Sequence, residues 1–117
     1  MGQGIEDVLR ENLRAAMRTK DSATLRAVRS ALARLANAEA VPIETMPRAG
    51  AVEAAIVGPG GADAPRRELT EDERRALLAD EIAELESARE SYRVAGHEEA
   101  ADVARASAEL LRRLLAR

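Results

Sequence analysis

Three arginines near the N-terminus are the side chains of this chain best suited to bind a ligand. Arg10, Arg14 and Arg18 recur at every fourth position, so a helix would place their guanidinium groups along one side. Such a row can contact successive phosphates of a nucleic acid. Three more basic residues extend the candidate surface: Lys20, Arg26 and Arg29. The alternative is a solvated face whose arginines pair with Glu6, Glu11 and neighbouring carboxylates, and the charge pattern favours it.

Side chains for catalysis or metal binding are scarce. The chain has no cysteine, which excludes disulfides and thiolate metal sites. The segment from His97 begins like a zinc-protease helix, but Ala101 stands where the second histidine is needed, and His97 is the only histidine. Carboxylates four residues apart, such as Asp80 and Glu84, lie in a segment crowded with charge, so a solvated face is the better interpretation. We therefore expect no catalytic residues, no metal site and no cofactor.

The composition indicates one helix-rich domain. With 117 residues, 46% apolar and 33% charged, the chain is long enough for one compact domain and too short for two ordinary ones. The net charge of −3 is uneven, because residues 1–41 carry seven Lys/Arg against five Asp/Glu, whereas residues 70–117 carry eight against twelve. A polyanion should therefore prefer the N-terminal half.

No apolar run approaches the roughly 18 residues that a membrane span needs. The N-terminus becomes charged at Glu6 and Asp7, so we expect no signal peptide. A cytoplasmic protein without membrane contact is the resulting expectation.

Apolar residues at helical spacing predict four helices, at about 5–18, 22–41, 71–95 and 98–117. Asp21 or Ser22 should cap the second helix. Thr70 and Glu73 have the spacing of a capping box at the start of the third, and Gly96 should end it with a glycine C-cap. The last two helices should therefore form a hairpin with a tight turn.

Residues 42–69 differ in composition, because they hold all four prolines and four of the seven glycines. We interpret this segment as a mobile linker, with a short helix or edge strand at 51–57 as the alternative. The predicted fold is all-α: two helical hairpins, about four helices, joined by a long Pro/Gly-rich linker within a single domain, 1–117.

Five motifs, in this order and spacing, resemble the GatB/YqeY family: LRAAMRTKD (13–21), LRAVR (25–29), NAE (37–39), ELTEDE (68–73) and ESYRVAGHEEAA (90–101). The family comprises the tail region of the B subunit of the tRNA-dependent Asp/Glu amidotransferase and stand-alone relatives. The resemblance implies an all-α domain with tRNA or the amidotransferase complex as its partner. It also brings the family's classification as a carbon–nitrogen ligase using glutamine, although that chemistry resides elsewhere in the amidotransferase.

This chain is shorter than the family pattern, which continues into a second small helical subdomain. Our leading hypothesis is a non-catalytic domain of the GatB/YqeY type. The alternative is a protein-interaction or oligomerisation module without RNA binding.

Four leucines near the C-terminus predict an apolar contact surface: Leu110, Leu111, Leu114 and Leu115. Burying each contributes roughly 1.5–3 kcal/mol, so they should pack onto the first or second helix or against another copy. In the absence of the second subdomain, we predict a homodimer through the last helix.

Overall fold

The computed structural model describes residues 3–40 and 67–117 of the chain. Within these ranges every regular element is an α-helix, which confirms the all-α prediction. The helices are α1 (Ile5–Thr19), α2 (Ser22–Ala40), α4 (Glu71–Val94) and α5 (Glu98–Leu115). Most of the predicted linker, including the alternative ordered piece at 51–57, lies outside the described residues.

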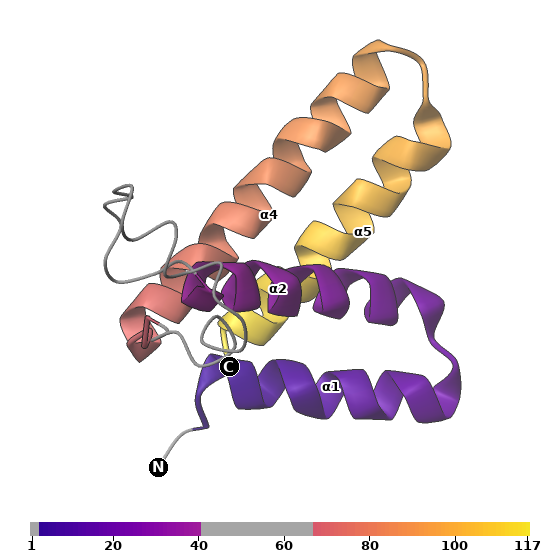
Figure 1. Cartoon of the computed structure of the whole chain (residues 1–117). Coiled ribbons are helices and arrows are strands. Elements are labelled where there is room, and N and C mark those ends of the chain that lie inside the picture. Colours follow the sequence, from indigo (N-terminus) through magenta and orange to yellow (C-terminus); the bar gives the residue numbers. More distant parts are fainter. Residues whose placement is uncertain (1–2, 41–66) are drawn as a thin grey trace, which may run out of the picture.

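The helices form two antiparallel hairpins, α1–α2 and α4–α5, that cross one another (Figure 1). Helix α2 contacts both helices of the second hairpin, and α1 also touches both. The two hairpins meet near the start of α4 and the end of α5. The opposite end of the α4–α5 hairpin extends away from this crossing, and residues 91–99 there are all exposed (Figure 1). The first hairpin therefore covers only part of the second.

Lys20 and Asp21 make the turn between α1 and α2. Lys20 has a left-handed backbone (φ 59°, ψ 41°), and its N–H donates to the carbonyl of Ala16. The Asp21 carboxylate accepts from the Thr24 N–H at 3.1 Å and from the Thr24 hydroxyl at 2.7 Å. Of the two predicted caps of α2, Asp21 is thus the one that binds the backbone.

Both ends of α4 form as the sequence predicts. The Glu73 N–H donates to the Thr70 hydroxyl at 3.1 Å, while the Thr70 N–H donates to the Glu73 carboxylate at 2.9 Å. At the other end Gly96 has φ +85°, and the His97 N–H donates to the Tyr92 carbonyl at 2.8 Å. This is a Schellman ending, in which glycine supplies the left-handed residue.

The core lies where the hairpins cross and contains no aromatic side chain. Several of its members are alanines on α2 and α5, whose small size lets helix backbones approach closely. The buried cluster is Ile5, Val8, Leu9, Ala27, Val28, Ala31, Leu35, Leu78, Ile82, Ala108, Leu111 and Leu114.

The last residues of the predicted linker, 67–69, contact the helices. The Arg67 N–H donates to the Glu39 carbonyl at 3.1 Å, and Leu69 is only 4% exposed. A backbone hydrogen bond and a buried leucine therefore hold residues 67–69 of this connection against the helices.

The leucines near the end of α5 are covered within one chain. Leu111 and Leu114 belong to the core, and Leu110 and Leu115 pack against it partly buried. The exposed apolar surface that motivated a homodimer through these four residues is thus absent, and the oligomeric state stays untested.

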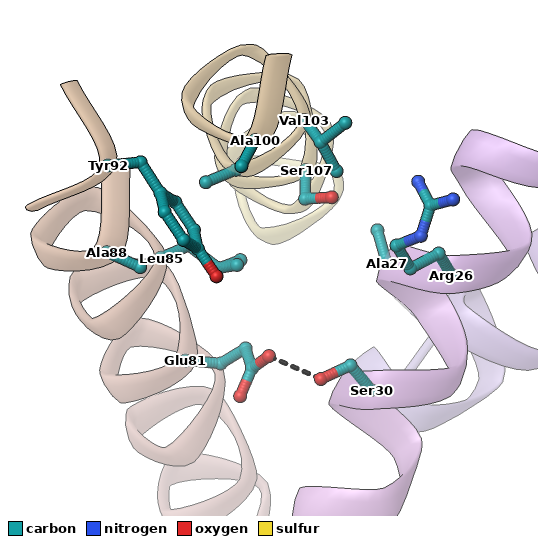
Figure 2. A pocket seen from close by; sticks show the side chains of 11 residues that line it. Arg26, Ala27, Ser30, Glu81, Leu85, Ala88, Tyr92, Ala100, Val103 and Ser107 are labelled. Atoms are coloured by element: carbon teal, nitrogen blue, oxygen red, sulfur yellow. Dashed lines mark hydrogen bonds between the residues drawn. The ribbon is translucent and has the colours of Figure 1, made fainter. Parts of the chain in front are cut away.

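Beyond the crossing, a hollow of about 460 Å³ remains between α2, α4 and α5 (Figure 2). Tyr92 on α4 and Val103 on α5 line it, and each is 41% exposed. The apolar stripes predicted on both helices are therefore longer than the surface that α2 covers.

Candidate functional site

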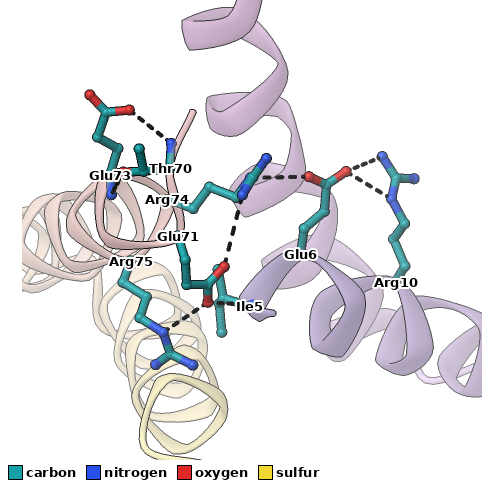
Figure 3. Close-up of polar contacts among 8 residues, drawn as sticks. All are labelled: Ile5, Glu6, Arg10, Thr70, Glu71, Glu73, Arg74 and Arg75. Atoms are coloured by element: carbon teal, nitrogen blue, oxygen red, sulfur yellow. Dashed lines mark hydrogen bonds and ion pairs between the residues drawn. The ribbon is translucent and has the colours of Figure 1, made fainter. Parts of the chain in front are cut away.

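The predicted basic row lies on the solvent side of α1, but its first member is occupied. Arg10 donates twice to the Glu6 carboxylate, with its closer nitrogen at 2.8 Å (Figure 3). Glu6 also lies 3.5 Å from the Nε of Arg74 on α4. Arg10 is thus tied to a network that joins the two hairpins, as the solvated-face alternative expected.

Arg14 and Arg18 differ from Arg10. Both are exposed, and neither forms an ion pair with another residue in the described ranges. Helix α1 nevertheless carries three carboxylates against its three arginines, so its net charge is zero. The row therefore offers two available guanidinium groups on an electrically balanced helix.

The remaining basic candidates lie outside helix α1. Lys20 is exposed in the turn after α1, and Arg29 is exposed on α2. Arg26 is also exposed, but it lines the hollow between the hairpins, to which α1 contributes no lining residue. The structure thus places three of the six candidates on α1, Lys20 in the following turn, and Arg26 and Arg29 on α2, where Arg26 lines the hollow.

The site that Arg26 lines consists of two adjoining hollows. The first lies between α2, α4 and α5, and the second, of about 450 Å³, lies between the start of α2 and the outer side of α5. Arg26, Val103 and Ser107 line both hollows. We call the two together the interhairpin groove. Alanine, leucine and valine supply about half of its lining residues, and the others are polar or charged apart from Tyr92.

Glu81 is the buried carboxylate of the groove wall. It is only 7% exposed, and it accepts from the Ser30 hydroxyl at 2.6 Å (Figure 2). It also accepts from Arg34 Nε at 2.8 Å. Arg34 also binds the exposed Glu84. The hydrogen bonds that Arg34 donates to Glu84 and to Glu81, the former having the larger effect, raise the pKa of Arg34. This cluster links α2 to α4 and sets one wall of the groove.

The other carboxylates of the groove lining are also engaged within the chain. Asp21 accepts from Thr24, and Asp102 lies 4.0 Å from Arg105. Arg26 and Arg113, in contrast, form no ion pair with any residue the structure describes. The lining of the groove thus holds three arginines and three carboxylates, and Arg26, Arg113 and Asp21 are the charged members that form no ion pair within the described ranges.

Of the two carboxylates weighed as metal ligands, Glu84 is occupied by Arg34, whereas Asp80 forms no ion pair within the described ranges. Within residues 3–40 and 67–117, no three His, Cys, Asp or Glu side chains gather as a metal site would require. In the same ranges no helix combines the length and apolar character of a membrane span.

Sequence reasoning missed the groove and the role of Glu81. One signal was present: Glu81 stands four residues after Leu77 and four before Leu85, within the apolar stripe of α4. A charge at such a position indicates a buried partner from another helix. The sequence did not show that Ser30 and Arg34 are that partner.

Comparisons with models of known protein families, with curated proteins and with solved structures gave no match. The resemblance to the GatB/YqeY family therefore rests on the motifs alone and stays a prediction.

Proposed function

We propose that this chain is a non-catalytic, cytoplasmic helical domain of the GatB/YqeY type that associates with tRNA or with the amidotransferase complex. The order of the five motifs over residues 13–101 supports the family. The exposure of Arg14 and Arg18 on one side of α1, unpaired within the described ranges, carries the tRNA contact.

The guanidinium groups of Arg14 and Arg18 would bind phosphates and make no contact with the bases. Two phosphate contacts predict a slope of about −2 for log K against log salt, and about −3 if Arg10 leaves Glu6 to make a third. The one aromatic residue, Tyr92, is on α4, so no stacking platform stands beside the row. Binding should therefore favour folded tRNA, recognised by its backbone shape.

A titration with bulk tRNA tests this proposal. At about 0.01 M salt, where screening acts only beyond about 30 Å, we expect binding that weakens steeply as salt is added. Arg14→Glu with Arg18→Glu should abolish it while leaving helicity unchanged, because exposed positions tolerate such changes within about 0.5 kcal/mol.

The matched control is Arg89→Glu with Arg93→Glu, which changes the net charge equally at two exposed positions toward the far end of the α4–α5 hairpin. This control should retain most of the binding. If both double variants lose tRNA equally, net charge rather than the α1 surface is responsible, and the proposed contact is wrong.

A protein-interaction module without RNA binding is the second candidate. The observation that favours it is the charge balance of α1, in which Arg10 is already paired with Glu6 at 2.8 Å. No detectable tRNA binding at low salt, where attraction is strongest, would select this candidate.

A further inference from the structure

The turn ends of the two hairpins carry opposite charge. Residues 14–29, which span the α1–α2 turn, hold five Lys/Arg against one Asp. Residues 89–104, which span the α4–α5 turn, hold two Arg against four Asp/Glu. We call the first segment the basic end and the second the acidic end. Their net charges at pH 7 are +4 and −2, so the two ends are electrostatically complementary.

The whole hairpins differ in the same sense. Residues 5–40 hold seven Lys/Arg against five Asp/Glu, whereas residues 71–115 hold seven Arg against twelve Asp/Glu. The difference in charge between the two ends is therefore part of a difference between the two hairpins.

The cations of the basic end are not neutralised by other described residues. All five are exposed, and none forms an ion pair within residues 3–40 and 67–117: Arg14, Arg18, Lys20, Arg26 and Arg29. The basic end thus presents its charge to whatever approaches it.

The acidic end has two carboxylates in the same condition. Glu98 and Glu99 are exposed in the first turn of α5 and form no ion pair with any residue the structure describes. Glu90, in contrast, binds Arg93. Arg89 is the one cation of this end without an ion pair in those ranges, and the two carboxylates outnumber it.

Exposed apolar side chains gather at the same two ends. Met17, at the basic end, is 54% exposed, and Val94, at the acidic end, is 73% exposed. Tyr92 and Val103 also belong to the acidic end, and these four are the exposed large apolar side chains of the described residues. Apolar contacts surrounded by charged groups are typical of interfaces between proteins.

We propose that the basic end binds the acidic end of a second copy, forming a two-fold symmetric dimer. The hairpins diverge from their crossing, so both turn ends project from the molecule (Figure 1). A two-fold axis beside them brings each basic end onto the acidic end of the other copy, because every contact is then made twice with the roles exchanged. Both charged ends and all four exposed apolar side chains are thereby covered.

Other occupants match fewer of these features. A nucleic acid would bind the basic end alone and leave Tyr92, Val94 and Val103 uncovered, and its phosphates would be repelled by Glu98 and Glu99. A different protein would need a basic and an acidic patch at matching positions, which a second copy already carries.

Light scattering on the full chain, free of nucleic acid, tests the dimer. Two small contacts predict a Kd of about 10 μM, so we expect a dimer mass at about 100 μM protein and about 0.01 M salt. Added salt should weaken the dimer, because the screening length falls from about 30 Å to about 10 Å at 0.1 M.

Charge reversal at either end should give a monomer. Glu98→Lys with Glu99→Lys makes both ends basic, and the triple variant Lys20→Glu, Arg26→Glu, Arg29→Glu makes both ends acidic. Each variant alone should be monomeric with unchanged helicity, and an equimolar mixture of the two should restore a 1:1 dimer.

Two further variants separate the ends from general effects of charge. Asp72→Lys with Asp80→Lys changes the net charge as Glu98→Lys with Glu99→Lys does, at exposed positions of α4 outside both ends, and should stay dimeric. Val94→Ser should raise the Kd at least tenfold without loss of helicity, because it removes an apolar contact that the dimer makes twice.

The proposal is overturned if the wild type is a monomer at about 100 μM, or if a dimer survives either charge reversal. It is also overturned if the mixture stays monomeric, if the Asp72/Asp80 control dissociates equally, or if Val94→Ser has no effect. The charge variants leave Arg14 and Arg18 unchanged and the assay contains no RNA. Failure of the dimer and failure of the tRNA titration are therefore separate results.

Discussion

The backbone N–H of Ile5 donates to the carboxylate of Glu71 at 2.8 Å, so the first residue of α4 caps the first turn of α1. Gly4 precedes α1 and provides no side-chain cap. The same carboxylate accepts from Arg75 at 2.9 Å (Figure 3). Arg75 also donates to the Leu115 carbonyl at the end of α5. One turn of α4 thus satisfies backbone groups at the start of the first helix and the end of the last.

Removing this cap should loosen the junction. We expect Glu71→Ala to lower the free energy of unfolding by about 1–2 kcal/mol, because an N-terminal cap contributes about 0.5–2 kcal/mol and the exposed ion pairs add little. Asp72→Ala is the matched control, since it removes a charge from the same first turn of α4 without touching α1. Urea denaturation measures both, and equal losses would contradict the capping role.

Arg34 binds two carboxylates of very different burial, which gives an internal comparison. Glu81→Ala should cost about 2 kcal/mol, because it leaves the partly buried Arg34 and Ser30 without their shared acceptor. Glu84→Ala should cost less than about 0.5 kcal/mol, because that carboxylate is 69% exposed. Thermal melting of the two variants distinguishes them, and a larger loss for Glu84→Ala would reverse the assignment.

The turn between α4 and α5 depends on glycine for conformation rather than for space. A Cβ built on Gly96 meets nothing within 4 Å, but φ is +85°. Gly96→Ala should therefore destabilise the protein by about 1 kcal/mol through backbone strain alone. Gly96→Asn should cost less, since asparagine tolerates the left-handed region better, and urea midpoints that failed to follow this order would argue against the Schellman ending.

The corresponding residue of the first hairpin is Lys20, a non-glycine residue with φ 59°. Lys20→Gly should raise the free energy of unfolding by up to about 1 kcal/mol, because glycine adopts this conformation without the Cβ clash. Lys20→Ala removes the same charge but keeps the strain, so it should give no such gain. A stabilised alanine variant would show that charge, not conformation, controls this turn.

Acid should weaken the start of α2. Hydrogen bonds from the Thr24 side chain and backbone lower the pKa of Asp21 below its usual 3.8. The folded state therefore favours the carboxylate, and its contribution is present above about pH 4–5 and lost as the pH falls through the folded pKa. Asp21→Asn should match the wild type at neutral pH, since asparagine caps equally well, and lose less stability on acidification. Melting temperatures across about pH 6 to 3 test this. A fall in melting temperature that is equal in the wild type and in Asp21→Asn would contradict it.

The local parts of the fold were predictable because their signals lie within a few residues. Thr70 and Glu73 are three positions apart, and Gly96 interrupts an otherwise continuous helical pattern, so chain-local hydrogen bonding fixes both ends of α4. The predicted helix limits differ from the observed ones by a few residues at most, as fraying ends usually do.

The groove could not be read from the sequence, because it depends on how the hairpins cross. The apolar stripe that includes Tyr92 and Val103 predicts burial, and nothing in the spacing shows that α2 stops short of covering it. The sequence also left open whether the arginines of α1 are paired. Glu6 lies four residues from Arg10 and forms an ion pair with it, whereas the contact between Glu6 and Arg74 joins residues 68 positions apart. Long-range contacts of this kind decide which charges remain available.

The Arg67 N–H bound to the Glu39 carbonyl has a consequence for the order of the helices. It holds the end of α2 beside the entry to α4, while Glu71 and Arg75, one turn apart, hold the start of α1 and the end of α5. The helical body therefore has two places where helix ends lie side by side. The chain connects the end of α2 to the start of α4, but the start of α1 and the end of α5 have no covalent connection. A circular permutant that joins the present termini and opens the chain between Ala40 and Arg67 would run α4, α5, α1, α2, with every helix–helix contact of the native protein retained.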